Sequence, residues 1–215
     1  MSLKSYTVSS IKNQELLLNG KGDSKLWEEA FSLTDFSSPW KQDPIAKIEF
    51  KAIHNQTHLY CRFRVADPNV YVDTTDDTKD SINESDRVEL FFRSNEKLDP
   101  YFCLEIDPTA RLMDFKARPQ RAFDFDWNWP VKDIEIQSSV ENDYFTVEIA
   151  ITLDSLSELG LLKGNRLETG IYRAKYKQQA DETYEPTWIT WVDPKTEVPD
   201  FHIASSFGCF IFEGI

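Results

Sequence analysis

The side chains best placed to act on a ligand lie near the end of the 215-residue chain. A strand-like segment carries Trp188 and Trp191, and a Pro-bounded loop after it presents Phe201 beside His202. A folded core does not require an aromatic residue in such a loop. A flat ring held next to a rigid strand can stack on the apolar face of a sugar ring while nearby polar groups bond the hydroxyls. The segment therefore predicts an aromatic platform, with His202 able to hydrogen-bond the same ligand.

Glu89 and Arg173 are charged residues that suit the hydroxyls of such a ligand. Glu89 is out of phase with its apolar neighbours in a strand-like segment and shares its face with Phe91. A carboxylate on an apolar-lined face can orient a ligand in a cleft, and a solvated outer face is the alternative. The guanidinium fork of Arg173 suits hydroxyls and carboxylates; its alternative is cross-strand pairing with a Glu, which contributes little at a surface. Both residues are candidate ligand contacts.

Trp127 and Trp129 flank a single residue, so in an extended segment both indoles face the same side. A face this aromatic is either a lid on the core or a stacking surface for a ligand. Trp27 and Trp191, by contrast, stand among alternating apolar residues and are expected in the core.

Composition disfavours some classes of partner. The net charge of −13 and the pI near 4.7 give the surface a negative field that repels nucleic acid and anionic membrane surfaces. The sequence holds no run of about eighteen apolar residues, so membrane insertion is not expected, and its first residues lack the apolar core of a signal peptide. Cys61, Cys103 and Cys209 lie in apolar strand-like runs, which predicts buried, reduced thiols.

No metal ligands are assigned from the sequence. The Cys-x-x-Cys and paired-His spacings typical of zinc are absent from it. The acidic run from Asp73 to Asp86 has no Gly at the sixth position of an EF-hand loop counted from Asp73. A solvated polar loop is the expectation for this run.

A period of two dominates the hydrophobic pattern. Apolar and polar residues alternate over 59–65 and 145–151, which is typical of half-buried antiparallel strands. Further strands are expected at 45–53, 87–93, 101–106, 112–117, 133–140, 170–177, 187–192 and 209–212. Together they predict an all-β fold, a single antiparallel β-sandwich of jelly-roll or immunoglobulin-like type.

Helical signal is confined to two short segments. Ser24 is expected to cap a turn over 27–31, and Thr152 a helix over 153–159. The sequence shows no internal repeat or linker, so residues 1–215 are expected to form one domain.

Several segments share residues and order with a known family. They are Leu18-Asn19-Gly20 with Leu26, Trp27 and Ala30; 59–67; Ser85 to Phe92; 144–156; and the stretch from Trp191 through 199–202 to Gly208. Their order and spacing cover nearly the whole chain. In this arrangement the sequence resembles the family 9 carbohydrate-binding modules and the wider DOMON-like group of β-sandwiches.

The resemblance implies a jelly-roll-like sandwich that holds the end of a saccharide chain between aromatic rings. Glu89 matches the family carboxylate that bonds sugar hydroxyls, and Phe201 matches an aromatic platform. Arg173 matches an arginine of a related subgroup. A second platform ring is expected near Asn83, where this sequence has none, so the resemblance implies weak binding by half of an aromatic clamp.

The predicted function is non-catalytic binding of a saccharide or polysaccharide chain end. We expect one cleft lined by Glu89, Arg173, Phe201 and His202, with Trp127 and Trp129 supplying rings in place of the one missing at Asn83. The resemblance also implies an extracellular or periplasmic location, either beside a catalytic domain in a larger polysaccharide-degrading protein or as a stand-alone binder. It allows structural calcium ions.

Two other functions remain open on the sequence. A glycoside-active enzyme needs two carboxylates about 5 to 10 Å apart, but no nucleophile or metalloprotease motif singles out a catalytic residue, and none is assigned. A haem-binding electron-transfer domain, which the DOMON-like resemblance brings in, requires Met113 to pair with His202 or His54.

Overall fold

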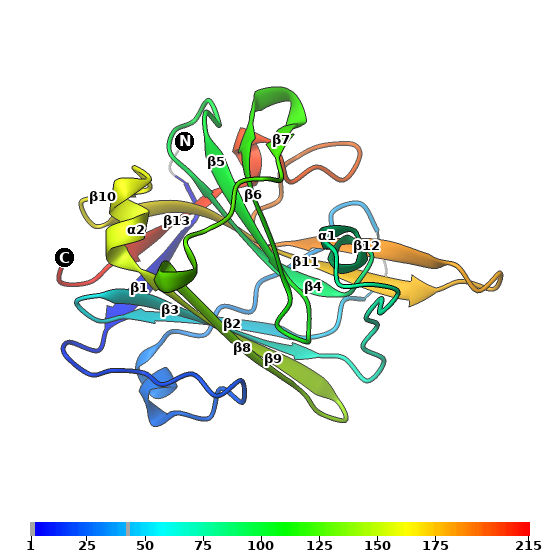
Figure 1. Ribbon diagram of the computed structural model, residues 1–215, viewed down its shortest axis with the longest axis horizontal. Coiled ribbons are helices and arrows are strands. Elements are labelled where there is room, and N and C mark those ends of the chain that lie inside the picture. The colour runs from blue at the N-terminus through cyan, green and yellow to red at the C-terminus, as the bar shows by residue number, and fades with distance from the viewer. Residues whose placement is uncertain (1–2, 42–43) are drawn as a thin grey trace.

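The computed structural model describes residues 3–41 and 44–215, which form two curved β-layers (Figure 1). The strands are β1 (Ser5–Ser10), β2 (Ile48–His54), β3 (His58–Ala66), β4 (Arg87–Arg93), β5 (Tyr101–Ile106), β6 (Leu112–Arg118), β7 (Ala122–Asp124), β8 (Ile134–Val140), β9 (Tyr144–Thr152), β10 (Leu162–Lys163), β11 (Arg166–Gln178), β12 (Tyr184–Thr190) and β13 (Gly208–Phe212). The helices are α1 (Lys79–Asn83) and α2 (Leu153–Glu158), with 3-10 turns η1 (Lys25–Glu29), η2 (Pro119–Arg121), η3 (Val131–Asp133) and η4 (Ala204–Ser206). Strands hold 43% of the residues and helices 12%, which confirms the predicted all-β class.

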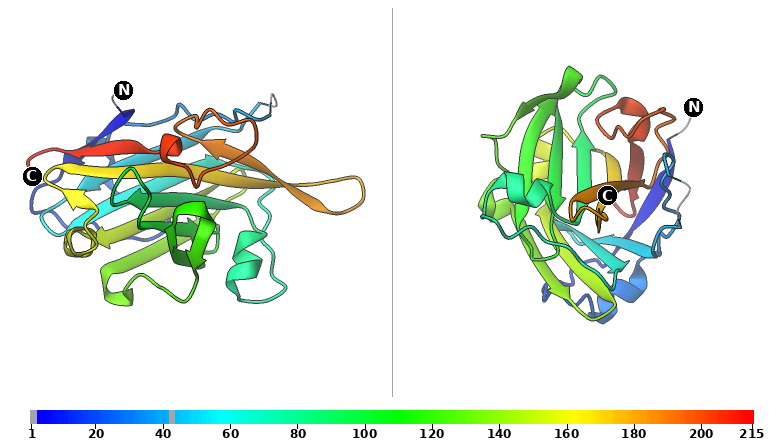
Figure 2. Two further views of the ribbon diagram at one scale, coloured as in Figure 1. Left: turned by 90° about the horizontal axis from the view of Figure 1, so that it is seen from above. Right: turned by 90° about the vertical axis from the view of Figure 1, so that its right-hand side faces the viewer.

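The described strands belong to one curled sheet. Its order is β7-β6-β5-β4-β11-β13-β1-β2-β3-β9-β8, with β10 and β12 paired to β11 off this path. The two halves of the sheet face each other, as the end-on view in Figure 2 shows. The jelly-roll or immunoglobulin-like strand order remains a prediction.

Strand β1 joins the two layers. Its first residues pair with β13 in one layer, and Ser9 and Ser10 pair with β2 in the other. Both pairings are parallel, so the prediction of a wholly antiparallel sandwich is wrong at β1. The hydrophobic pattern did not single out this strand because its only large apolar side chains are Tyr6 and Val8.

The main core fills the space between the layers. On β3 the inward face carries Leu59, Cys61, Phe63 and Val65, as the alternation predicted, and all four are fully or almost fully buried. Trp27 and Trp191 are also buried, which confirms the expectation for both. Burying one large apolar side chain stabilises a fold by roughly 1.5–3 kcal/mol, so this core is the main source of stability.

A second hydrophobic cluster covers the outer face of β4, β5, β6 and β11. Its members include Phe91, Phe115, Tyr172, Phe201 and Phe207, so the loop after β12 closes over this face. Strand β4 is consequently buried at each of its seven residues. Polar side chains on the outer face of β4 are thus enclosed by protein instead of facing solvent.

The two expected helical segments are confirmed. The Ser24 side chain accepts a hydrogen bond from the Leu26 backbone at the start of η1, and Thr152 accepts one from Ser155 at the start of α2. Helix α1 lies inside the acidic run that was expected to be a polar loop, so that expectation is corrected. Within the described residues no helix is long and apolar enough to cross a bilayer.

The three cysteines are free and buried, as predicted. Burial raises the pKa of the Cys61 thiol well above its ordinary value, so little reactive thiolate is available at neutral pH.

We expect a thiol reagent to label none of the three cysteines in the native protein and all three in denaturant, with the number of labels measured by mass spectrometry. Rapid native-state labelling of Cys61 would contradict this packing.

Candidate functional site

A cavity of about 430 Å³ opens on the outer face of β4 and β5, and we call it the outer-face cavity. Its lining residues are Lys79, Asp80, Asn83, Arg87, Glu89, Glu105, Met113, Phe115, Arg121, Phe123, Phe125, Trp188, Phe201 and His202. The structure therefore brings Glu89 together with Phe201 and His202 from two distant parts of the chain, as expected for these three residues. Polar groups and aromatic rings both line this cavity.

Three charged residues on neighbouring strands form the polar part of the wall. Arg87 and Glu89 lie two positions apart on β4, and Glu105 of β5 stands directly opposite Glu89 in the register. The Arg87 Nε lies 2.6 Å from Glu105 Oε2 and 3.0 Å from Glu89 Oε1. The Arg87 Nη1 donates to the backbone oxygen of Asn83 at 2.5 Å. One guanidinium thus bridges two carboxyl groups and ties them to the end of α1.

Burial makes the two carboxyl groups hard to ionise together. Burial, and then the neighbouring Glu105, raise the pKa of Glu89 to about 8 against the opposing effect of Arg87. Burial likewise raises the pKa of Glu105. Among the described residues, Glu89 Oε1 has no hydrogen-bond partner of good geometry, although Arg87 Nε is close. At neutral pH, Glu89 is therefore largely a carboxylic acid that can both donate to and accept from a ligand hydroxyl.

Aromatic rings form the apolar part of the wall. Phe123 and Phe125 come from β7 and the turn after it, and their ring centroids lie 5.7 Å apart. Phe125 is 47% exposed, which leaves much of its ring free for contact. Trp188 of β12 lies under the guanidinium of Arg87, 5.4 Å from the ring centroid. Phe125 and Trp188 are the rings best suited to a ligand face.

Phe201 lines the cavity but is itself packed. Its ring stacks on Tyr172 with centroids 4.1 Å apart and an interplanar angle of 12°, and it meets Trp188 edge to face. Only 6% of the residue is exposed. Because one face of the ring is covered, Phe201 supports the wall as well as lining it, and its removal would cost stability as well as contact.

His202 is held in its neutral form. Burial and the nearby Arg121 lower the pKa of its imidazole to about 4. Its Nδ1 lies 2.9 Å from the Tyr101 hydroxyl. Asp200 fixes the loop, because its Oδ1 accepts from both the His202 backbone N–H and Arg121 Nη2. A neutral ring in this position presents hydrogen-bonding capacity without charge.

Trp127 and Trp129 do not line the outer-face cavity, so the expectation of one shared cleft is wrong for them. Trp129 is 2% exposed in the main core, and Trp127 packs against Phe102 with centroids 4.8 Å apart. A turn at residues 125–126 precedes the tryptophans, and both indoles pack in or against the main core. Two other rings of the same segment, Phe123 and Phe125, line the cavity.

Arg173 also lies outside the outer-face cavity. It follows Tyr172 on β11, and successive strand residues point to opposite faces. Tyr172 stands opposite Glu89 in the register and packs in the outer cluster, whereas Arg173 points to the other face and forms an ion pair with Asp67. The expected grouping of Arg173 with Glu89 is therefore corrected.

Sequence reasoning missed several residues of this site. Arg87 and Glu105 flank the matched Glu89 in sequence or register, and Trp188 was noted only as part of an aromatic strand. Alternation along the strands places these residues on the same face of the sheet as Glu89 and Tyr172, and this pattern could have identified them from the sequence.

Among the described residues, no group of three or more His, Cys, Asp or Glu side chains is arranged to hold a metal ion.

Comparison with known proteins places the chain in a family. The family model described as carbohydrate family 9 binding domain-like matches residues 18–214, and the chain belongs to this family. A search of curated protein sequences finds no match.

Solved structures share the fold at low sequence identity. A candidate carbohydrate-binding protein from Bacteroides uniformis is 17% identical with a TM-score of 0.73, over 99% of this chain and 100% of that one. A family 9 carbohydrate-binding module from Caldicellulosiruptor kristjanssonii in complex with glucose is 15% identical with a TM-score of 0.64, over 99% and 97% of the two chains. A family 9 module from the same organism in complex with cellotriose is 15% identical with a TM-score of 0.62, over 99% of this chain and 95% of that one.

The raised pKa of Glu89 predicts a specific pH dependence of stability. A carboxyl group whose pKa is higher in the folded state stabilises the fold below its unfolded pKa, and that contribution is lost as pH rises to about 8. We expect the melting temperature of the wild-type protein to fall between about pH 5 and pH 8 more steeply than that of Glu89→Gln.

The matched control is Glu96→Gln, because Glu96 is an exposed carboxylate in the loop after β4. It should show the wild-type slope. Equal slopes for Glu89→Gln and wild type would contradict the assigned protonation of Glu89.

Proposed function

We propose that the protein binds a saccharide, without turnover, in the outer-face cavity. The observation that carries this proposal is the combination, in one cavity of about 430 Å³, of exposed aromatic ring surface with a buried Arg–Glu–Glu group. Sugars have apolar ring faces and polar edges, so a site for them needs both kinds of surface. Membership of the family, and the neighbours bound to glucose and cellotriose, support the same class of ligand.

The proposed binding mode assigns a role to each part of the wall. A sugar ring lies against Phe125 and Trp188, and its hydroxyls bond to Glu89, Arg87 and His202. A protonated Glu89 can donate to one hydroxyl oxygen and accept from another hydroxyl, which a carboxylate cannot do. Arg87 is prealigned by Glu105, so little ordering is needed on binding.

Weak and reversible binding is expected from this geometry. Stacking and a few hydrogen bonds in a partly open site give micromolar to millimolar dissociation constants, about −4 to −8 kcal/mol. The absence of a ring at Asn83 favours the weaker end of that range. Such a module gains affinity for a polysaccharide when it is joined to a second binding or catalytic domain, and we propose an extracellular polysaccharide as the natural target.

The arrangement of the carboxyl groups favours binding over glycoside hydrolysis. Hydrolysis needs an acid and a nucleophile or base placed on different sides of the scissile bond. Glu89 and Glu105 instead stand side by side on adjacent strands and share one guanidinium. Met113 and His202 both line the cavity, but Met113 is 4% exposed and packed in the outer cluster, which leaves it poorly placed as a haem ligand.

Phe125 offers the clearest test because it is exposed. Phe125→Ala should weaken cellotriose binding by about 1 to 3 kcal/mol, by analogy with nucleobases stacked on aromatic side chains, and leave the melting temperature nearly unchanged. Phe201→Ala should weaken binding and lower the melting temperature, because that ring is packed on Tyr172. Isothermal titration calorimetry and thermal unfolding measure the two effects.

The matched control is Phe31→Ala, because Phe31 is 57% exposed and lies outside the lining of the outer-face cavity. It should bind cellotriose like the wild type. Unchanged affinity in Phe125→Ala would place the sugar elsewhere. Release of reducing sugar from a polysaccharide, lost in Glu89→Gln, would replace the binding function with an enzymatic one.

A further inference from the structure

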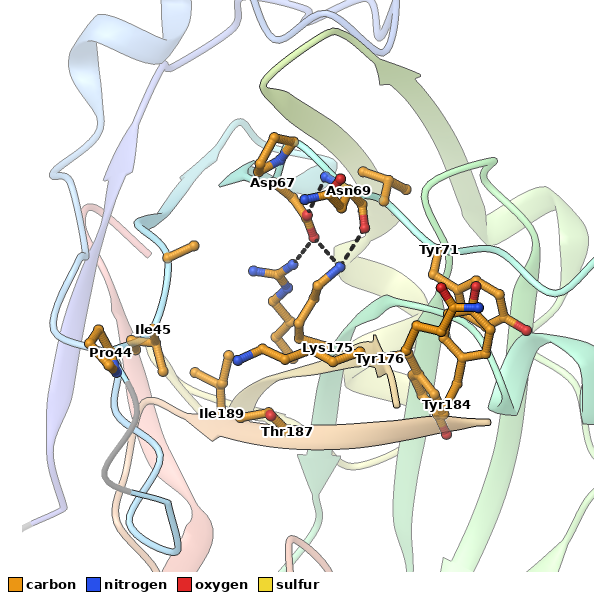
Figure 3. Close-up of a pocket in the computed structure, with 16 residues that line it drawn as sticks. Pro44, Ile45, Asp67, Asn69, Tyr71, Lys175, Tyr176, Tyr184, Thr187 and Ile189 are labelled. Carbon is orange, nitrogen blue, oxygen red and sulfur yellow. Dashed lines mark hydrogen bonds and ion pairs between the residues drawn. The ribbon is translucent and has the colours of Figure 1, made fainter. Parts of the chain in front are cut away.

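A second, larger cavity lies on the other face of β11. Its volume is about 620 Å³, and within the described residues it shares no lining residue with the outer-face cavity. Figure 3 shows Thr187 and Ile189 on one strand below, Asp67 and Asn69 above, and Pro44 with Ile45 on one side. Tyr71 and Tyr184 lie on the opposite side, and we call this space the tyrosine cavity.

Buried cations form the centre of the tyrosine cavity. Arg173 is 1% exposed, and its Nη2 forms an ion pair with Asp67 Oδ2. Lys175 Nζ lies 2.9 Å from the same carboxylate oxygen and 2.8 Å from Asp86 Oδ2, and donates to the Asn69 carbonyl at 2.7 Å. One carboxylate oxygen of Asp67 therefore serves two cations.

The Arg173 guanidinium is incompletely hydrogen-bonded. Its Nε is buried and has no hydrogen-bond partner among the described residues. Burial lowers the pKa of Arg173 against the effect of Asp67 and then Asp86, which reflects the cost of keeping this guanidinium out of water. A buried charge needs both an opposite charge and hydrogen bonds to offset desolvation. A ligand oxygen that reaches Nε would supply the acceptor that it lacks.

The residues that line the tyrosine cavity carry mostly positive charge, whereas the whole molecule is negatively charged. Three cations, Arg173, Lys175 and Lys177, line the tyrosine cavity against the single carboxylate of Asp67, in a chain of net charge −13. Asp86 Oδ2 lies 2.8 Å from Lys175 Nζ, and Glu185 stands opposite Lys177 in the register, although neither carboxylate lines the cavity. The lining therefore presents mainly cationic groups to a ligand, while the surrounding carboxylates balance their charge.

Tyrosines supply a ring surface at one end of the cavity. Tyr71 and Tyr184 stack with centroids 3.6 Å apart and an interplanar angle of 14°, and Tyr176 lies 6.2 Å from Tyr71. Tyr71 and Tyr184 are both partly exposed. A ring on the ligand can therefore contact tyrosine while a charged substituent points towards the cations.

We infer that the tyrosine cavity is a second ligand site, for a small ring-bearing carboxylate such as a uronic acid. The carboxylate suits the planar guanidinium of Arg173 and the ammonium groups of Lys175 and Lys177, and the ring suits the tyrosines. This site stands on residues separate from those of the proposed saccharide site. It also gives Arg173, predicted from sequence as a ligand contact, a ligand of a different kind.

The test compares a charged sugar with its uncharged counterpart. Amide chemical shifts of the ¹⁵N-labelled protein are followed while D-glucuronate, D-glucose or benzoate is added. We expect D-glucuronate to move the signals of Asn69, Tyr71 and residues 175–177 in a saturable manner, and added salt to weaken this binding. D-glucose should leave those signals in place. Benzoate tests whether the site prefers an aromatic acid to a sugar acid. Saturable binding of either acid supports a carboxylate site, and tighter binding of D-glucuronate identifies the ligand as a sugar acid.

Lys177→Ala is the variant of choice because Lys177 is exposed and its loss should not disturb folding. It should weaken D-glucuronate binding several-fold, whereas Lys97→Ala, an exposed lysine in the loop after β4, should not. Phe125→Ala should leave these shifts unchanged. A loss of binding at the proposed saccharide site can therefore be distinguished from a loss of binding in the tyrosine cavity. Absence of saturable shifts with both acids, identical shifts with D-glucose, or wild-type affinity in Lys177→Ala would overturn the inference.

Discussion

Strand β11 is buried on both faces, and this constraint determines where the functional side chains lie. Residues 169–174 of this strand are all buried, with Ile171 packed in the main core on one face and Tyr172 in the outer cluster on the other. A period of two then sends Tyr172 to the outer cluster and Arg173 to the opposite side. Tyr172 consequently supports Phe201 in the wall of the outer-face cavity, whereas Arg173 lines the tyrosine cavity. The same alternation on β4 gives Val88 to the main core and Glu89 to the outer-face cavity.

Burial of charge accompanies this arrangement in both cavities. Arg87 lies between Glu89 and Glu105, and Arg173 lies beside Asp67 with Lys175 sharing the same carboxylate. Ion pairs this deep do not stabilise a fold efficiently, since desolvation offsets much of the Coulombic attraction. Their more evident consequence is preorganised polar groups that need little rearrangement to meet a ligand. In the outer-face cavity, burial and the neighbouring Glu105 raise the pKa of Glu89 to about 8 and so favour its protonated form.

The sequence was sufficient for the features that depend on local pattern. The limits of β4 and β5, the inward face of β3 and the cap at Thr152 follow from alternation and capping chemistry, and the structure agrees. Glu89 and Phe201 were also placed in one site through resemblance to the family, and His202 through its position beside Phe201. The pairing of β1 with both layers was not accessible, because it depends on contacts with strands far along the chain.

Long-range contacts also explain the errors within the site. The turn that sends Trp127 and Trp129 towards the core is held by Lys79, whose Nζ donates to the backbone oxygens of Phe125 and Asp114. That lysine lies on α1, a helix hidden in an acidic run, so the sequence around the tryptophans carries no sign of it. Alternation along β11 shows which residues share a face with Arg173. Which of the two faces meets Glu89, however, depends on how the sheet closes.

An atomic structure of the protein with cellotriose would show directly where the sugar binds. We expect a sugar ring in the outer-face cavity, in contact with Phe125 and Trp188 and with hydroxyls within hydrogen-bonding distance of Glu89 and Arg87. Density for the sugar at Trp127, in the tyrosine cavity or at no fixed position, with the outer-face cavity empty, would contradict it.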